Sequence, residues 1–336
     1  IIFLFSSIIY ITSTYWFYKI LKNRLNKNLI FIFTLLPSTF LFNFFDPLTV
    51  GRKEILVFFF FTFYYLNISK IDLFIKYKII TFITFIFIIL THEIIFFFIP
   101  YLFILKFLYI KSDKLKFGDY LFEFLILFFG ILIFFIIVKI NHLHNNEVLC
   151  NSLLNIDLTK NSCWAINDFK SKISITFLYS YFIEKNYFRN YLIYYILTSI
   201  PLILLIVQSE NNKKKIFILL YILALIFSLS FFGQVNDWGR YLNVIFLIQF
   251  LCILFLTKSD VSLNIYKYDM FYFIKLFTII LYLVSWHMPH CCNDKLGKGY
   301  ISVYERILMR VKDNSIESTK YQDLPRMYLR KLFKID

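Results

Sequence analysis

The stretch DPLTVGRKEILVFFFFTFYYLNI, residues 46–68, decides the class of the fold. Residues 55–66 are almost entirely apolar, and about 20 such residues cross a bilayer as a helix. A helix satisfies its backbone polar groups internally, as a lipid environment requires. We therefore expect a transmembrane helix over residues 47–68, with charged residues close to its start.

The composition of the whole chain extends this expectation. The 336 residues are 60% hydrophobic and 22% aromatic, which is far from the composition of soluble domains. We expect an all-α polytopic integral membrane protein of about ten transmembrane helices. The expected spans are residues 1–18, 29–45, 47–68, 71–90, 94–110, 120–138, 190–207, 216–232, 241–257 and 271–286.

The connections between these spans alternate in charge. Five are basic, and the positive-inside rule places them in the cytoplasm: residues 19–28, 70–78, 111–116, 211–215 and 258–269. The outward set is residues 46–54, 91–93, 139–189, 233–240 and 286–292. The net charge of +15 therefore reflects topology, and no nucleic-acid partner is expected. A single long helix over 71–110, kinked at Pro100, is the alternative that would reverse every later connection.

Two regions are expected along the chain. Residues 1–290 form a transmembrane helical domain, with short helices in the long outer loop, and residues 291–336 form a soluble, basic, amphipathic tail. The topology places this tail outside, and one span more or fewer near residue 286 would place it inside. The chain opens on Ile1 within an apolar run, so we expect further sequence before it.

The cysteines and histidines suggest a structural role. Cys252 lies in a span and is interpreted as a small core residue. The outer cysteines allow three disulfide pairings, of which Cys150 with Cys163 is preferred. No metal site is expected, because the ligand spacing in HMPHCC, residues 287–292, is wrong for a common zinc motif.

The charged residues of the opening stretch are the first candidate site. Asp46 and Pro47 are typical of a helix start, which would place Arg52, Lys53 and Glu54 about 8 to 11 Å along the helix axis. Ionisable groups at such depth usually face a cavity or the bundle interior. Either the two cations bind an anionic ligand, or an ion pair with Glu54 or another helix only locks the packing.

Two further outward turns carry candidate residues. His92 and Glu93 follow a short apolar run, so we expect a recessed turn whose pair transfers protons, or alternatively holds the helix break. Asp237 precedes another apolar run and is interpreted as an N-cap or a catalytic carboxylate. Arg240 follows on the same helix face, and its guanidinium suits a phosphate or carboxylate.

These residues together favour group transfer from a lipid-linked phosphate donor. The cations Arg52, Lys53 and Arg240 would stabilise the leaving phosphate, and a carboxylate would deprotonate the acceptor hydroxyl. The candidate catalytic residues are Glu54, His92, Glu93 and Asp237. No soluble nucleotide-sugar domain is visible, so the expected donor is a polyprenyl-phosphate-linked sugar, and no cofactor is expected.

The ten spans, the long outer loop, GRKE (51–54), HE (92–93) and DWGR (237–240) resemble bacterial polysaccharide polymerases of the Wzy type. More loosely, they resemble GT-C glycosyltransferases. The resemblance implies glycan synthesis at the outer face of the bacterial cytoplasmic membrane. It also implies a polyprenyl-phosphate-linked glycan, membrane lipids and an envelope-glycan assembly complex as partners. The alternatives are a transporter or flippase of an anionic or lipid-linked substrate, and a scaffold without activity.

Overall fold

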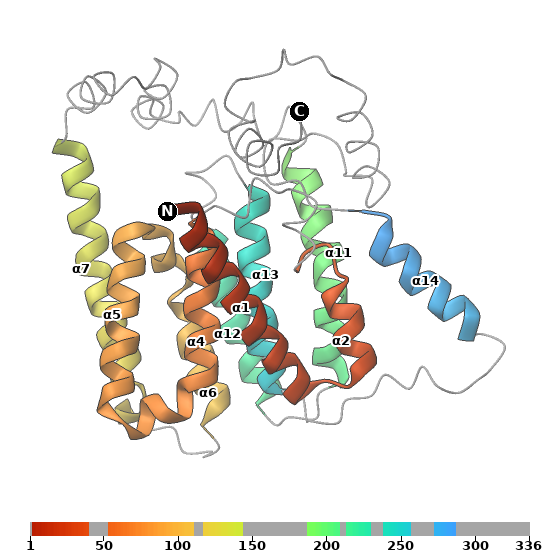
Figure 1. The fold of residues 1–336 in the computed structure, drawn as a ribbon, viewed down its shortest axis with the longest axis horizontal. Coiled ribbons are helices and arrows are strands. Elements are labelled where there is room, and N and C mark those ends of the chain that lie inside the picture. The colour runs from red at the N-terminus through yellow and green to blue at the C-terminus, as the bar shows by residue number, and fades with distance from the viewer. Residues whose placement is uncertain are drawn as a thin grey trace, which may run out of the picture.

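The computed structural model describes residues 2–39, 53–110, 117–143, 187–208, 213–229, 238–256 and 272–286. All the regular elements in these ranges are helices, as the all-α prediction requires (Figure 1). They are α1 (Ile2–Arg24), α2 (Lys27–Thr34), α4 (Glu54–Leu73), α5 (Ile75–Thr91), η2 (Glu93–Phe98), α6 (Pro100–Tyr109), η3 (Phe117–Tyr120), α7 (Leu121–Leu143), α11 (Tyr187–Gln208), α12 (Lys214–Leu229), α13 (Trp238–Leu256) and α14 (Tyr272–Val284).

Helix α13 is the centre of the bundle. Its sequence is apolar on all sides, which is typical of a helix surrounded by others. It packs against α4, α6, α11 and α12, and almost all of its residues are buried. Cys252 is fully buried within it, which confirms its interpretation as a core residue. Every element that contacts α13 is therefore positioned relative to one buried axis.

Aromatic rings join the first helices to this axis. Phe17 of α1 contacts Phe58 of α4 and Phe250 of α13 edge to face, at centroid distances of 5.4 and 5.5 Å. Phe33 of α2 stacks on Phe250 at 4.2 Å. Large rings thus occupy the space between these helices, and they fix the positions of α1, α2 and α4 on α13.

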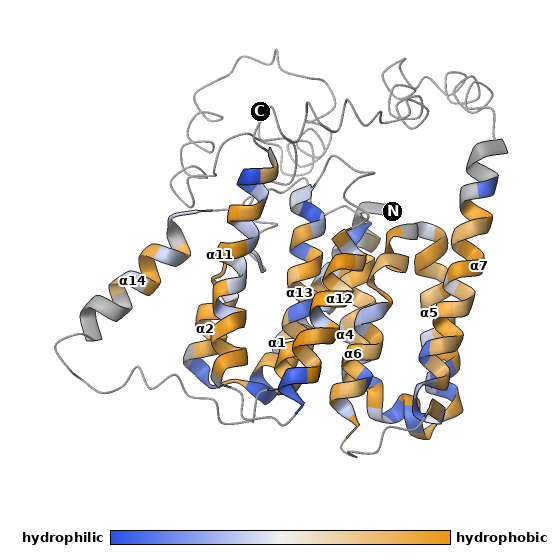
Figure 2. Ribbon diagram, turned by 180° about the vertical axis from the view of Figure 1, so that it is seen from behind, coloured by the Kyte–Doolittle hydropathy of each residue, from blue (hydrophilic) through white to orange (hydrophobic). Residues whose placement is uncertain are grey.

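Most residues of the helices are hydrophobic (Figure 2), and many large apolar side chains are exposed. Phe128 and Phe135 on α7 and Val207 on α11 are each more than 60% exposed, as expected where lipid or protein covers the surface. Within the described residues, four helices are long and apolar enough to cross a membrane: Glu54–Leu73, Phe117–Ile137, Phe188–Val207 and Trp238–Leu256. The described part of the chain is therefore compatible with a membrane protein.

The chain reverses direction between α5 and α6. Helix α5 ends at Thr91, His92 has an extended backbone (φ −154°, ψ 96°), and η2 follows. Lys106, near the end of α6, then forms an ion pair with Asp72 at the end of α4. The chain has returned to the end where α5 began, so the expected break between the two helices is confirmed and a single helix over 71–110 kinked at Pro100 is wrong. Pro100 stands at the start of α6, where its fixed φ is favourable.

Several expected spans begin or end at other residues, and two of these differences bear on the candidate site. An unbroken helix over 29–45 is wrong, because α2 ends at Thr34 ahead of Pro37. The Thr39 hydroxyl instead donates to the Phe33 and Leu36 carbonyls at 2.8 and 2.9 Å. Helix α4 begins at Glu54, so the prediction that Glu54 lies 8 to 11 Å along this helix is also wrong. Asp46 and Pro47 lie outside the described residues.

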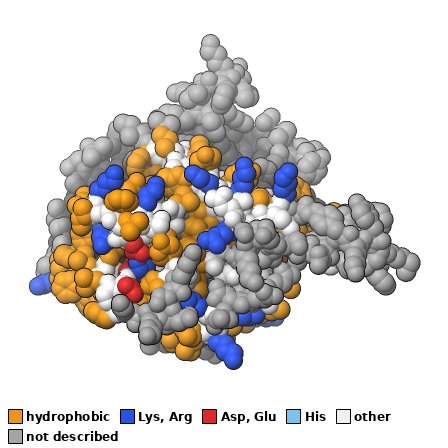
Figure 3. Space-filling view, turned by 90° about the horizontal axis from the view of Figure 1, so that it is seen from below, with side chains coloured by type: hydrophobic (Ala, Val, Ile, Leu, Met, Phe, Trp, Pro, Cys, Tyr) orange, Lys and Arg blue, Asp and Glu red, His pale blue; other side chains and the backbone are white. Residues whose placement is uncertain are grey.

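The described basic helix ends gather at one end of the bundle. The last turn of α1 carries Lys22 and Arg24, that of α4 carries Lys70, and α12 begins at Lys214. Figure 3 views this end directly and shows several Lys and Arg side chains on it. We call it the basic end, and we call the end where α4 and α13 begin the Arg240 end. The placement of the basic end in the cytoplasm and of the Arg240 end outside stays a prediction.

Candidate functional site

A buried ion pair joins the starts of α4 and α13. Glu54 is the first residue of α4, and Arg240 lies in the first turn of α13. The Arg240 Nη1 atom is 2.8 Å from Glu54 Oε1, and the two residues are only 8% and 7% exposed. Each charge offsets much of the cost of burying the other. Glu54 also compensates the unfavourable position of an arginine at the positive end of the α13 dipole.

Two rings extend this pair toward α5. Tyr241 follows Arg240, and its ring centroid lies 5.7 Å from the guanidinium carbon. The half-buried His92, which caps the end of α5, has its ring centroid 6.5 Å from that of Tyr241. We call Glu54, His92, Arg240 and Tyr241 the Arg240 cluster. It is assembled from three helices at one end of the bundle.

Buried polar groups surround the Arg240 cluster. Asn243 lies one turn below Arg240 on the same face of α13, and its side-chain amide donates to the Ser38 carbonyl at 2.6 Å. The second carboxylate oxygen of Glu54 and the Ser38 hydroxyl are buried without a hydrogen-bond partner among the described residues. A buried acceptor left in this way is costly, and a ligand hydroxyl could supply the missing hydrogen bond.

The structure brings together three of the residues selected from the sequence, namely Glu54, His92 and Arg240. Lys53 is exposed at the N-cap of α4 and makes no side-chain capping bond. Glu93 begins η2 directly after His92. The partner of Glu54 is therefore an arginine from a distant helix, not a neighbouring cation in its own segment.

Other predictions fall on residues that the structure does not describe. They are Arg52, Asp237, Cys150, Cys163, His287, His290, Cys291 and Cys292, together with the C-terminal tail. Among the residues that it does describe, no group of three or more His, Cys, Asp or Glu side chains could hold a metal ion. The candidate site rests on the Arg240 cluster alone.

Sequence reasoning missed a polar group in the middle of the bundle. Gln249 is fully buried on α13, and its side-chain amide lies 3.2 Å from the hydroxyls of Tyr101 and Tyr195. The Tyr101 hydroxyl is in turn 3.4 Å from that of Ser228. This network joins α6, α11, α12 and α13. The only signal in the sequence was one glutamine within an apolar run.

A second missed group lies nearer the basic end. The Tyr64 hydroxyl of α4 donates to Glu123 of α7, which is fully buried. The buried Lys106 of α6 pairs with Asp72 of α4 and also interacts electrostatically with Glu123. Glu123 was detectable as a lone acid in the apolar run LFEFLILFF, residues 121–129. Ionisable groups inside such helices often mark a functional site.

The Arg240 cluster combines an anion-binding group with groups that can transfer a proton. Its guanidinium offers several donors to a phosphate or carboxylate, and a carboxylate and an imidazole lie beside it. Comparison of the chain with protein-family models, with curated proteins and with solved structures gives no match. The geometry and chemistry of the cluster are therefore the only guide to its role.

Proposed function

We propose that the chain is a membrane-embedded glycan polymerase or glycosyltransferase that uses a polyprenyl-phosphate-linked sugar donor. It would have about ten spans and act at the outer face of the bacterial cytoplasmic membrane. The observation that carries the proposal is the buried contact of Arg240 with Glu54, beside Tyr241 and His92. This cluster lies at the end of the bundle opposite the basic helix ends (Figure 1).

In the proposed reaction, the donor phosphate competes with Glu54 for the Arg240 guanidinium. The released Glu54 carboxylate accepts the proton of the acceptor hydroxyl, whose oxygen attacks the anomeric carbon of the donor sugar. The bond from that carbon to the phosphate oxygen breaks, and the leaving lipid phosphate or pyrophosphate takes the electron pair. Arg240 stabilises this developing charge, as preorganised donors do in transfer reactions.

His92 and the residues beside the cluster complete the proposal. His92 would exchange protons with Glu54 or with solvent, since histidine titrates near neutral pH. Lys53 would attract the lipid phosphate from the surface of the bundle. Arg52, Glu93 and Asp237 are each adjacent in the chain to a described residue at the Arg240 end, and they stay candidates for binding the phosphate or a proton.

A transporter of an anionic substrate is the second candidate. It is favoured by the polar groups buried deeper in the bundle, around Gln249 and around Glu123. Transporters place such groups along the substrate path. This function predicts movement of an unchanged substrate across the membrane, with no new glycosidic bond.

The test is the surface-glycan chain length in cells whose only copy of the chain is Glu54→Gln, His92→Gln or Arg240→Lys. Lys53→Gln and Asn67→Ala are compared in parallel; the Asn67 side chain donates to the Phe63 carbonyl of its own helix. The amount of each variant in the membrane is measured by immunoblot. Lipid-linked units are extracted and separated by size.

We expect Glu54→Gln and Arg240→Lys to insert normally, to lose polymer by about 100-fold and to accumulate single lipid-linked units. His92→Gln should retain partial activity, and Asn67→Ala should behave as wild type. Normal polymer in the inserted Glu54 and Arg240 variants would refute glycan transfer. Lipid-linked units that accumulate only on the cytoplasmic face would instead support transport.

A further inference from the structure

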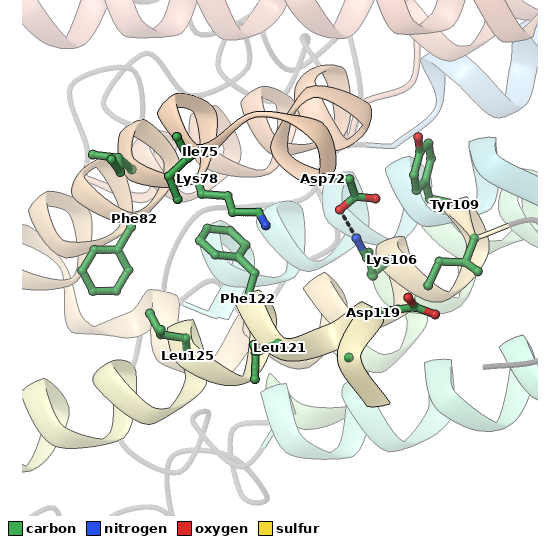
Figure 4. A pocket seen from close by; sticks show the side chains of 13 residues that line it. Asp72, Ile75, Lys78, Phe82, Lys106, Tyr109, Asp119, Leu121, Phe122 and Leu125 are labelled. Carbon is green, nitrogen blue, oxygen red and sulfur yellow. Dashed lines mark hydrogen bonds and ion pairs between the residues drawn. The ribbon is translucent and has the colours of Figure 1, made fainter. Parts of the chain in front are cut away.

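A second concave site lies at the basic end, far along the bundle from the Arg240 cluster. It is a cavity of about 910 Å³ between α5, α6, η3 and α7 (Figure 4). Most of its wall is apolar, and Lys78, Lys106, Asp72 and Asp119 supply its charged groups. The apolar lining comes from Ile75, Ile79, Phe82, Ile110, Leu121, Phe122 and Leu125.

Helices α5 and α7 are in close contact at Gly130, and the cavity lies between this contact and the basic end. A Cβ atom at Gly130 of α7 would lie 2.7 Å from Ile99 and 3.3 Å from Phe85 of α5, so the helices touch there. The rings of Phe82, which lines the cavity, and Phe129 of α7 meet edge to face at 5.1 Å. Nearer the basic end, nothing approaches within 4 Å of a Cβ atom placed at Gly118.

The charged groups of the cavity are two lysines and two aspartates, which occupy different parts of it. Lys106 is buried and already paired with Asp72. Lys78 extends across the cavity toward that pair, and it forms no ion pair among the described residues (Figure 4). Asp119 lies beyond Lys106 as seen from Lys78. The part of the cavity between Phe82, Phe122 and Lys78 therefore combines one available cation with apolar walls.

The exposed helix faces continue this combination into the lipid region. Ile79 is 52% exposed, Leu125 is 42% exposed and Phe128 is 64% exposed. Lysines at such a boundary place their methylene groups along apolar surface and their ammonium group at the headgroup level. Cationic side chains there attract anionic lipids. A ligand with a phosphate at one end and hydrocarbon at the other matches this surface better than a free anion.

We propose that this cavity binds the phosphate headgroup of an anionic membrane lipid, from the leaflet at the basic end of the bundle. The Lys78 ammonium contacts the phosphate, and the lipid chains lie along Ile79, Leu125 and Phe128. This site is separate from the proposed glycan transfer, which uses the opposite end of the molecule. The bound lipid would fill the cavity between α5, α6, η3 and α7.

The experiment is native mass spectrometry of the full chain in detergent, titrated with dioleoyl phosphatidylglycerol or dioleoyl phosphatidylcholine. Lys78→Gln removes the cation, and Lys76→Gln is the matched control, because Lys76 lies over the Tyr77 ring and does not line the cavity. Gly118→Asp adds an opposing charge in open space, and Gly118→Asn is its uncharged counterpart. Inorganic phosphate at millimolar concentration is the competitor.

We expect phosphatidylglycerol to bind about fivefold more weakly to Lys78→Gln and Gly118→Asp than to wild type. Lys76→Gln and Gly118→Asn should bind it as wild type does, and inorganic phosphate should not displace it. Equal binding of the two lipids, equal loss in the control variants, or displacement by inorganic phosphate would each overturn the proposal.

Discussion

At the scale of single residues, Glu54 and Arg240 each reduce the cost of burying the other's charge. Both are almost inaccessible to solvent, and their contact joins two helices far apart in the sequence. A buried pair is weak support for stability as a whole, but the loss of one partner leaves an uncompensated charge. Removal of one partner should therefore lower stability much more than the intact pair raises it, and stability has to be measured beside activity in each variant.

Glu54→Ala should therefore lower the free energy of unfolding by about 3 to 5 kcal/mol, because Arg240 stays buried without its carboxylate. The measurement is the thermal unfolding of the purified chain in detergent. Lys53→Ala, one residue earlier and exposed, should change stability by less than about 0.5 kcal/mol. If the two variants lost equal amounts of unfolding free energy, the ion pair would not stabilise the contact of α4 with α13.

Gln249→Leu should cost about 1 to 2 kcal/mol, because it leaves the Tyr101 and Tyr195 hydroxyls without the amide that joins them. The same unfolding assay measures this loss. In the double variant with Tyr101→Phe, the two losses should not add, because both changes remove the same hydrogen bond. Full additivity would contradict the network.

At the scale of elements, the contact between α5 and α7 depends on the small residue at Gly130. A side chain there would meet Ile99 of the segment before α6 and Phe85 of α5. Gly130→Leu should therefore lower the free energy of unfolding by about 1 to 3 kcal/mol through overpacking. Gly118→Leu, placed in open space on the same side of the bundle, is the control. If Gly130→Leu left the free energy of unfolding unchanged, α5 and α7 would be able to move apart at little cost.

The sequence predicted most of the described helices, because long apolar runs bounded by charged connections are a strong signal. It failed at α2, where Pro37 ends the helix early, and at α4, which begins at Glu54. At α2 the apolar run continues while the backbone does not stay helical. Hydropathy alone therefore locates a segment better than it locates its ends.

The candidate site was predictable in part. Charged residues at the starts of apolar runs are unusual, so Glu54, His92 and Arg240 were recognisable one by one. Their meeting in space was not predictable, because it depends on which helices pack together. The cavity around Lys78 was missed for another reason: Lys78 and Asp72 lie in the basic connection 70–78, where charge is explained by topology alone.

At the scale of the whole molecule, the two ends of the bundle should face opposite sides of a membrane. Single cysteines at Lys53 and at Lys76 test this prediction, in a chain whose five native cysteines are replaced. Lys53→Cys should react with a membrane-impermeant maleimide in intact cells, and Lys76→Cys should react only after permeabilisation. Reaction of both positions in intact cells would contradict the topology.

The central claim is that Glu54 and Arg240 take part in chemistry and do more than hold α4 against α13. The most direct measurement is glycan chain length in cells that carry the exchanged pair, Glu54→Arg together with Arg240→Glu. Each residue lies in the first turn of its helix, so the exchange keeps the ion pair and the balance of charge against the helix dipoles. We predict normal membrane levels with no polymer; polymer of normal length would show that the pair is structural.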